Sequence, residues 1–379
     1  METITLSLAS GLADFRTPAG EKEFEVIVVT QTPGNIGEDE LLPFRLIRHP
    51  SVGLLWNCIR DSDVLHLAGP ALAPLFLAWL ARKPVVIEHH TYQSICPNGL
   101  LIHQPDRLIC PGHFQARRYL RCLRCQANEV SWLRALANLL LMFPRHFLSR
   151  IAASNIAVTQ HVLTRHKLPR SFVIYHGVPE SMERESQVDS AHMRPATICF
   201  AYVGRLVAEK GLPVLLLATQ KLKKEGRSFK VQLIGDGPER SRLEATIKRD
   251  DLETHVCVTG YLRGDALQEA LRKVQVLTMP SVWEETAGLA AIEQMMRGKL
   301  VIASDTGGLG EVLDEAGLRC PAGDADALAD CMRAVLSDPS LIESLGRKAR
   351  ERALLLFRRP RMLEQHVGVY RQLLREMRT

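Results

Sequence analysis

PSVWEETAGLAAIEQMMRGKLVIAS, residues Pro280–Ser304, carries the densest pattern in the chain. It follows the apolar run Val274–Met279, which breaks at Pro280, so a buried strand is predicted to end there. Alanines and methionines then recur at helical spacing, and Lys299–Ala303 has the continuous apolar character of another buried strand. A strand, a helix and a strand in this order predict a parallel sheet.

Three carboxylates lie in this stretch. Glu284 and Glu285 are adjacent, and Glu293 follows Glu285 by about two turns at ~3.6 residues per turn. This spacing predicts that Glu285 and Glu293 lie on one side of the element, beside Gly288, where a helix start can hold an anion. Carboxylates that bind hydroxyls next to a phosphate site are what a nucleotide sugar requires. An acidic cap on an amphipathic helix explains the same residues, and the spacing alone leaves both interpretations open.

Length and composition limit the class of protein. With 379 residues the chain exceeds one ordinary core, so two domains are expected, and 46% hydrophobic with 24% charged residues is typical of soluble globular proteins. Nine cysteines, an odd number, favour a reducing compartment. Residues 1–4 lack the positive region of a signal peptide, and the apolar run Ala68–Ala81 is too short to cross a bilayer. We expect a cytoplasmic protein, at most peripheral at the inner face of a membrane.

Strand and helix patterns alternate twice along the chain. Residues 1–190 predict a first α/β domain with a helix at Ala71–Leu80, and residues 195–358 a second one; polar residues 180–194 predict a linker. The predicted strands are Phe24–Thr30, Asp63–Ala68, Pro84–Glu88, Ile156–Thr159, Phe172–Tyr175, Thr197–Val203, Lys230–Ile234, His255–Thr259, Val274–Met279 and Leu300–Ala303. Residues 359–379 predict a closing helix with an apolar stripe of Leu363, Val367, Tyr370 and Leu374.

Two cations follow the first strand of the second domain. Gly204 permits close backbone approach, and Arg205 and Lys210 lie where ligands bind in open α/β sheets. Two such cations can neutralise a diphosphate leaving group without a metal. A solvated arginine and lysine in a loop is the alternative.

The two motifs together resemble the retaining family-4 glycosyltransferases, enzymes of the GT-B fold. The motif W-E-E-x-x-G-L-x-x-x-E matches at Trp283, Glu284, Glu285, Gly288, Leu289 and Glu293, and G-R-L-x-x-E-K-G matches at residues 204–211. At position 287 the family often has Phe and this chain has Ala, which leaves a smaller wall beside the donor sugar. The resemblance covers about residues 24–375 and implies an α/β protein with two doubly wound, Rossmann-like domains facing across a cleft.

The resemblance also implies roles for individual residues. Glu293 binds ribose hydroxyls, Glu285 the hydroxyls of the sugar, and Arg205 with Lys210 the departing diphosphate. His90 aligns with the histidine of the family's H-D-Y pattern and contacts the sugar from the first domain; Thr91 replaces the usual Asp. The other residues implied to line the donor are Gly204, Gly235, Gly237, Tyr261, Leu262, Ala287, Gly288 and Leu289. Asp305–Glu311 is interpreted as a structural turn.

The implied reaction moves a hexose from a UDP- or GDP-hexose to a hydroxyl of a saccharide or lipid-linked acceptor, with retention, in cell-surface polysaccharide or glycolipid synthesis. It requires no metal and no cofactor. Only 23 residues precede the strand at Phe24, so the first domain is expected to have a shortened start, and a non-catalytic sugar-nucleotide-binding subunit is one alternative. A GT-B nucleotide-sugar epimerase is another.

Four cysteines lie in an insert at residues 93–130. Cys122 and Cys125 have metal-ligand spacing, and Cys96 and Cys110 upstream complete a set of four thiols for zinc. The intervals of fourteen and twelve positions are irregular for a compact zinc knuckle, so we favour ordinary reduced thiols and keep zinc as the alternative.

Positive charge is concentrated in the same domain. Between Arg107 and Arg170 there are eleven Arg and Lys residues against one acid, Glu129, which suggests anionic partners. No nucleic-acid-binding motif accompanies this charge, so an anionic lipid surface or a phosphate-bearing acceptor is favoured over nucleic acid. Solvated arginines with no partner are the alternative. Ser131–Leu148 predicts a buried domain helix, with an interfacial membrane helix as the second interpretation.

Overall fold

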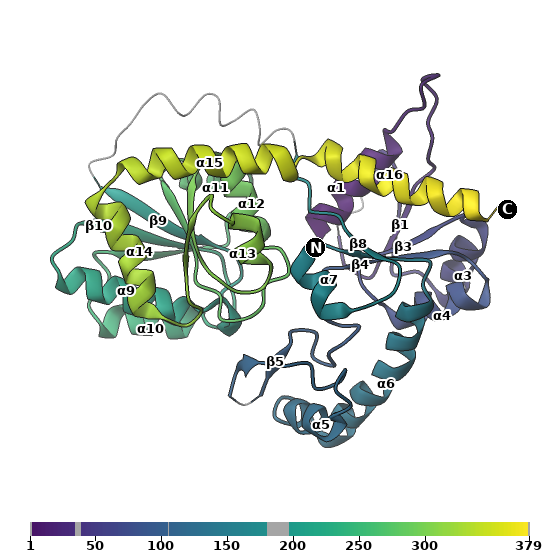
Figure 1. Ribbon diagram of the computed structural model, residues 1–379, viewed down its shortest axis with the longest axis horizontal. Helices are drawn as coiled ribbons and strands as arrows, with labels where there is room; N and C mark the ends of the chain where they lie inside the picture. Colours follow the sequence, from purple (N-terminus) through teal and green to yellow (C-terminus); the bar gives the residue numbers. More distant parts are fainter. Residues whose placement is uncertain (1, 35–38, 105, 180–196, 378–379) are drawn as a thin grey trace. The chain divides into compact units, whose positions relative to one another are not determined.

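The computed structural model describes residues 2–34, 39–104, 106–179 and 197–377. They form two compact units, which are drawn together in Figure 1 and described separately below. Unit 1 comprises residues 1–177 and 359–379, and unit 2 comprises residues 178–358. The linker predicted at residues 180–194 lies outside the described residues.

Unit 2 is built on a six-stranded parallel sheet with the strand order β11-β10-β9-β12-β13-β14. Counted from the first strand of the unit, this order is 3-2-1-4-5-6, that of a doubly wound nucleotide-binding sheet. The strands are β9 (Ile198–Val203), β10 (Phe229–Ile234), β11 (Val256–Gly260), β12 (Val276–Met279), β13 (Leu300–Ser304) and β14 (Leu318–Cys320). The five strands predicted for this domain are confirmed. β14 was not predicted, since it has three residues and Arg319 in it is exposed.

Helices cover both faces of this sheet because its side chains alternate. Phe200 and Tyr202 of β9 belong to a core shared with α9, α10 and α14, whereas Cys199 and Ala201 pack with α11 on the other face. The helices of the unit are α9 (Leu212–Lys224), α10 (Arg240–Arg249), α11 (Gly264–Arg272), α12 (Leu289–Met296), α13 (Gly308–Leu313), α14 (Ala325–Ser337) and α15 (Ser340–Leu356), with a 3-10 turn η1 (Ala208–Lys210).

Unit 1 contains a parallel sheet with the order β3-β4-β7-β8 and two separate strand pairs, β1-β2 and β5-β6. The strands are β1 (Ile27–Thr30), β2 (Arg45–Arg48), β3 (Leu65–Leu67), β4 (Val85–His89), β5 (Ile102–His103), β6 (Leu108–Ile109), β7 (Ser154–Ala157) and β8 (Ser171–Val173). The strand predicted at Phe24–Thr30 is present as β1, but it hydrogen-bonds to β2. The sequence RLIR of β2, with arginine at both ends, lacks the apolar run by which the other strands were found.

The helices of unit 1 are α1 (Glu2–Ala13), α3 (Val52–Asp61), α4 (Leu72–Leu80), α5 (Tyr119–Ala127), α6 (Trp132–Ile151), α7 (Gln160–His166) and α16 (Arg359–Glu376). Helix α1 was not predicted, and it packs against α16, the closing helix. The stripe predicted for α16 is partly wrong. Val367 and Tyr370 are buried, but Leu363 and Leu374 are only half-buried, because the buried face also contains His366.

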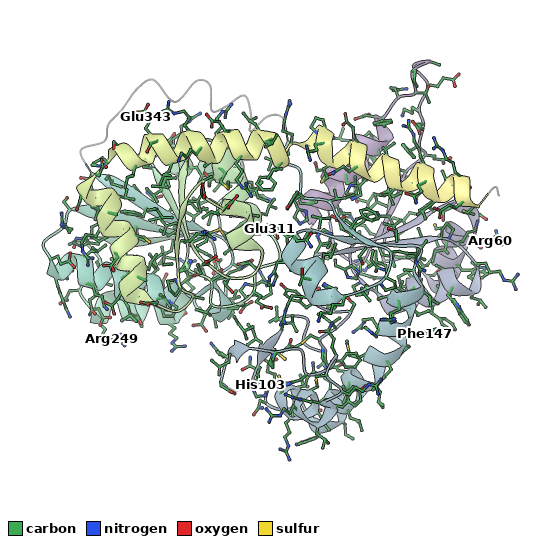
Figure 2. The ribbon with its side chains drawn as sticks, viewed as in Figure 1. Arg60, His103, Phe147, Arg249, Glu311 and Glu343 are labelled. Carbon is green, nitrogen blue, oxygen red and sulfur yellow. The ribbon has the colours of Figure 1, made fainter. Side chains whose placement is uncertain are left out.

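Helix α6 was expected to be a buried domain helix, but only part of its surface is buried. Ala135, Leu139 and Met142 are buried, while apolar side chains at helical spacing along an adjoining side are exposed. The exposed apolar residues of α6 are Trp132, Leu133, Leu136, Leu140, Leu141, Phe143, Phe147 and Ile151. Figure 2 labels Phe147, whose exposed fraction is 58%. No helix among the described residues is long and apolar enough to cross a membrane.

Candidate functional site

The predicted donor residues of unit 2 lie in loops at one edge of its sheet. Residues 204–211 follow β9, and residues 280–288 follow β12, the strand that pairs with β9. All strands are parallel, so both loops leave the sheet at the carboxyl ends. The connection from β9 leads to β10 on one side and the strands from β12 onward lie on the other, which makes this edge the switch point where such sheets bind ligands.

Two glycines allow the loops after β9, β10 and β12 to approach one another closely. Gly211 has φ +66°, and a Cβ there would lie 1.9 Å from the carbonyl oxygen of Pro280. The loops after β9 and β12 are also joined by a hydrogen bond, in which the Val282 N–H donates to the carbonyl of Glu209 over 3.0 Å. Gly235 has φ +146°, and its Cβ would lie 1.8 Å from the carbonyl oxygen of Gly204. A side chain at either glycine would therefore force the loops apart.

Glu285 is the most constrained side chain at this edge. It is 4% exposed, and its Oε1 accepts hydrogen bonds from Lys210 Nζ at 2.5 Å and from Ser281 Oγ at 2.7 Å. The Lys210 ammonium also lies 5.4 Å from the centroid of the Trp283 ring. A carboxylate removed from water needs such partners, because an unpaired buried charge is strongly destabilising. Ser281 was missed, and its only signal in the sequence is a small hydroxyl directly after the proline that ends a strand.

The turn after β13 holds the backbone of Glu285. The Gly308 N–H donates to the carbonyl of Glu285 over 2.6 Å, and a Cβ on Gly307 would lie 2.4 Å from the same carbonyl oxygen. The glycine-rich turn at residues 305–311, interpreted as structural, thus contacts the main chain of the candidate site.

Glu293 and Glu285 do not share a helix. Helix α12 begins at Leu289, with Gly288 in a left-handed conformation at φ +71°, and Glu285 precedes it in the loop. The count of two helical turns therefore does not apply to residues 285–288, and the prediction that Glu285 and Glu293 lie on one side of the element stays a prediction. Burial raises the pKa of Glu293, and the charge of Arg297 opposes this effect.

The remaining donor residues of unit 2 differ in exposure. Arg205 and Tyr261 are exposed, Leu262 is half-buried, and Ala287 is buried. The Gly237 N–H donates to the carboxylate of Asp236 over 2.7 Å in the turn after β10. The contacts predicted between these residues and a donor stay predictions.

His90 in unit 1 directly follows β4 and is buried. Its ring stacks on that of His176, with 5.1 Å between centroids. Burial lowers the pKa of His90, and it lowers the pKa of His176 to about 3, so both rings are neutral at pH 7. The sugar contact predicted for His90 stays a prediction.

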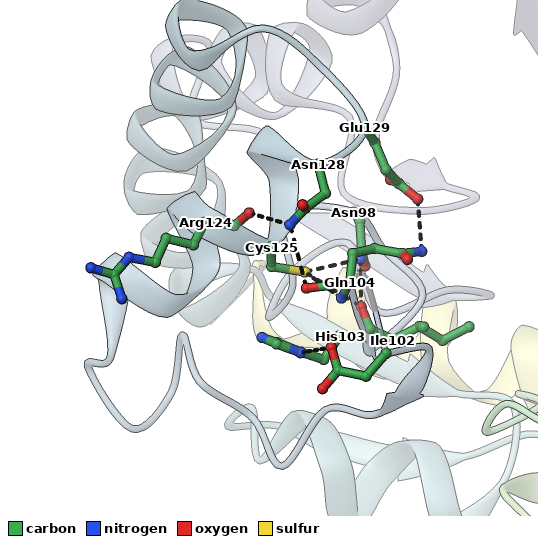
Figure 3. Close-up of polar contacts among 9 residues, drawn as sticks. Asn98, Ile102, His103, Gln104, Arg124, Cys125, Asn128 and Glu129 are labelled. Atoms are coloured by element: carbon green, nitrogen blue, oxygen red, sulfur yellow. Dashed lines mark hydrogen bonds and ion pairs between the residues drawn. The ribbon is translucent and has the colours of Figure 1, made fainter.

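The four cysteines of the insert are all buried. Burial and the neighbouring thiols raise the pKa of Cys122 to about 12, and burial raises the pKa of Cys96 to about 11. Figure 3 shows Cys125, whose Sγ accepts the backbone N–H of Gln104 at 3.3 Å, among polar side chains of the insert. In the described part of the chain, the groups of three side chains whose ligand atoms lie within 4.8 Å of one another contain no cysteine. Zinc and reduced thiols remain alternatives for Cys96, Cys110, Cys122 and Cys125.

Comparisons with known proteins agree with this architecture. Residues 184–352 match the family model described as glycosyl transferases group 1. The chain is 34% identical over 152 residues to the 2-deoxystreptamine glucosyltransferase of Streptomyces kanamyceticus, a match that covers 40% of the chain and 39% of that relative. It is 30% identical over 300 residues to the sulfoquinovosyl transferase SQD2 of Arabidopsis thaliana, covering 76% of the chain and 52% of that relative. The matches thus span about half of these relatives or less.

Solved structures resemble the whole chain. Anabaena HepE in complex with UDP and glucose has a TM-score of 0.71 at 17% identity, over 97% of this chain and 95% of HepE. Sucrose-phosphate synthase from Thermosynechococcus elongatus has a TM-score of 0.72 at 20% identity, over 99% and 94% of the two chains. At these identities the likeness establishes the fold, which is GT-B.

Proposed function

Because residues 184–352 belong to the group 1 glycosyltransferases and the fold is GT-B, we propose that the protein is a retaining glycosyltransferase. It transfers a hexose from a nucleoside diphosphate sugar to a hydroxyl acceptor. The observation that carries this proposal is the Lys210–Glu285 ion pair at the switch point of the 3-2-1-4-5-6 sheet. The relatives named above are glucosyl and sulfoquinovosyl transferases, which supports a hexose.

The ion pair suggests how the donor is received. In the absence of a donor, Lys210 neutralises the buried Glu285 carboxylate. A diphosphate brings two or more negative charges to this edge, where Lys210 and the exposed Arg205 can bind it, and Glu285 then accepts hydrogen bonds from hydroxyl groups of the sugar in place of Lys210. Ser281 keeps the Glu285 carboxylate oriented throughout because its hydroxyl bonds the same oxygen as Lys210.

We propose that leaving-group stabilisation comes from these cations together with the N-terminus of α12, without a metal or cofactor. Departure of the diphosphate develops negative charge, and preorganised donors at that point lower the barrier. Glu293, on α12, is the candidate for the ribose hydroxyls. Same-face attack assisted by the leaving phosphate needs no nucleophilic carboxylate.

For the acceptor we propose a saccharide or lipid-linked hydroxyl at an anionic membrane surface, in polysaccharide or glycolipid synthesis. The exposed apolar side of α6 supports this, since a stripe of Trp, Phe and Leu side chains runs along a helix of 20 residues. Arg117, Arg118, Arg121 and Arg124 on and beside α5 are exposed. Helix α5 packs against α6. Apolar side chains next to cations are the combination that binds anionic bilayers.

The proposed activity is tested with a panel of UDP- and GDP-hexoses. Binding is measured by thermal shift, and turnover by release of the nucleoside diphosphate with saccharide acceptors and extracted lipid acceptors. We expect one donor to stabilise the protein and to be consumed in an acceptor-dependent reaction whose product keeps the anomeric configuration of the donor.

The alternatives give different results in the same assays. A non-catalytic sugar-nucleotide-binding subunit would bind a donor without turnover for every acceptor. An epimerase would convert the donor without any acceptor. A chelator that abolishes transfer without unfolding the protein would contradict the metal-independent mechanism.

A further inference from the structure

Unit 1 buries a carboxylate among histidines, in a cluster outside the donor residues of unit 2. Glu88 on β4 is 2% exposed. Its Oε2 lies 3.3 Å from Nε2 of His66 on β3 and 3.6 Å from Nε2 of His366 on α16. His90 Nε2 lies 3.6 Å from the same oxygen. His66 lies 22 positions before Glu88 in the sequence, and His366 lies 278 positions after it. Three separate elements therefore meet at one carboxylate.

The charge of Glu88 requires compensation. Burial acts to raise the pKa of Glu88, but the neighbouring His90, His366 and His66 hold that pKa well below its usual range. A buried carboxylate is destabilising unless hydrogen-bond donors or a cation compensate its charge, and the Nε2 atoms of His66 and His366 lie within 3.6 Å of its Oε2.

The two histidines are oriented by their second nitrogens. His366 Nδ1 lies 2.8 Å from the carbonyl oxygen of Met362, which only accepts, so Nδ1 carries a proton and a neutral His366 points the lone pair of Nε2 at Glu88. His66 Nδ1 lies 2.8 Å from the Tyr370 hydroxyl. Histidines that bind metals are held in this way, with the far nitrogen hydrogen-bonded to a carbonyl or another polar group.

Two buried polar atoms of the cluster are unsatisfied. Among the described residues, neither Glu88 Oε1 nor His366 Nε2 has a hydrogen-bond partner. In a neutral His366 the lone pair of Nε2 faces the Glu88 carboxylate at 3.6 Å, and this contact is repulsive unless a proton or a metal cation lies between the two atoms. If Glu88 bound a metal ion through both of its carboxylate oxygens, the unsatisfied Oε1 would be the second ligand atom.

We propose that His66 Nε2, Glu88 and His366 Nε2 bind a divalent transition-metal ion, with zinc as the ion whose geometry fits. Ligand atoms about 2.0–2.1 Å from a tetrahedral zinc are separated by roughly 3.3–3.4 Å. The observed separations from Glu88 Oε2 are 3.3 and 3.6 Å, and one ligand atom from each of the three residues lies within 4.8 Å of the others. The nitrogen and oxygen donors suit zinc as well.

The ion would fasten α16 to the sheet of unit 1, because His366 belongs to α16 while His66 and Glu88 belong to neighbouring strands. This role is structural and independent of the proposed transfer reaction. Glu88, His90 and His176 form a second group of compatible spacing. In that group the two imidazole rings are stacked at an interplanar angle of 5°, which directs their lone pairs side by side instead of towards one ion.

The first test is metal content. Protein made without a histidine tag and without metal-affinity chromatography is analysed for bound metals, and we expect about one equivalent of zinc that depends on these side chains. His366→Asn and His66→Asn should each lose it. His49→Asn is the matched control, since His49 is exposed in the same unit and lies at φ +47°, which Asn tolerates. Cys122→Ser shows whether any of the bound metal is held by the cysteines. His176→Asn shows whether any of it is held by the second group, Glu88, His90 and His176.

The second test reports metal binding in folded protein. After chelator dialysis, added zinc should raise the Tm of the wild-type and of Cys122→Ser, but not that of His366→Asn, with unchanged far-UV circular dichroism as the check on folding. In the Cys122→Ser background, His366→Cys should bind cobalt(II) with a thiolate charge-transfer band that His366→Ser lacks. A metal-free wild-type protein whose Tm ignores zinc, full zinc content in His366→Asn, or loss of zinc in His176→Asn alone would overturn the assignment.

Discussion

Glu285 and its neighbour Glu284 provide a matched pair at the scale of single residues. Glu285 is buried and bound by Lys210 and Ser281, whereas Glu284 is half-buried. Losing a hydrogen bond to a charged group costs about 1.5–3 kcal/mol, so Glu285→Gln should lower the transfer rate roughly 10- to 150-fold. Glu284→Gln should stay within a few-fold of wild-type. Steady-state kinetics with circular dichroism on both variants measures this, and equal rates for the two would remove Glu285 from the donor site.

Arg205 and Lys210 are expected to act on the leaving group more than on recognition. Arg205→Ala and Lys210→Ala should lower kcat more than they raise KM for the donor, because the diphosphate gains charge as the bond to the sugar breaks. Lys210→Ala also leaves Glu285 without its cation, so the double variant with Glu285→Gln should unfold at a higher temperature than Lys210→Ala alone. Unchanged kcat in both single variants would contradict the role.

Glu293 should make nucleotide binding depend on pH. Burial raises its pKa, so the folded, empty protein holds the proton up to a higher pH than the unfolded chain, and this group lowers stability as pH rises through that interval. Ribose hydroxyls donate to the ionised carboxylate, so affinity should be full above the raised pKa and should fall as pH drops through it. Glu293→Gln should bind UDP or GDP more weakly at neutral pH and should lack this dependence.

Calorimetric titration of both proteins between pH 5 and pH 8 provides the comparison for Glu293. Titration of the nucleotide phosphate affects both proteins equally, so the difference between them isolates residue 293. Parallel pH profiles for wild-type and Glu293→Gln would assign the ribose contact elsewhere.

At the scale of secondary-structure elements, α6 makes a prediction about lipid. Its exposed apolar stripe and the arginines of the adjoining α5 should bind vesicles that contain anionic lipid, and the binding should weaken at high salt. Replacing Leu136, Leu140 and Phe147 by Gln should reduce co-sedimentation without loss of Tm, since all three are exposed. Leu217→Gln on α9 of unit 2 is the control, being about as exposed as Leu136. Binding that ignores lipid charge and salt would exclude the membrane as the partner of α6.

Helix α6 and the short strands β2 and β14 show what the local sequence pattern does not predict. The prediction of a helix at Ser131–Leu148 is confirmed by α6, but apolar residues on every side of a helix do not show which sides other elements cover. The buried side packs on α4 and α5, and the exposed side was therefore decided by how many neighbours the fold supplies. Short strands such as β2 and β14 were missed because their stability comes from pairing with β1 and β13.

At the scale of the whole molecule, two α/β units and the position of the donor motifs could be read from the order of residues. Apolar runs buried on both faces are a local property of parallel strands, and glycines and cations directly after them mark the carboxyl ends. This is why the sequence places Gly204, Lys210 and Glu285 at one edge of the sheet, and their roles toward a donor stay predictions.

Tertiary structure alone decided which side chains meet. Lys210 and Glu285 are 75 positions apart, and His66 and Tyr370 are 304 positions apart, yet each pair is in hydrogen-bond contact. No local period encodes such contacts, because they follow from the strand order and from the packing of α16 in unit 1. For the same reason the helical count does not extend from Glu293 back to Glu285: the backbone turn at Gly288, which packs against Leu309 after β13, separates the loop from the helix.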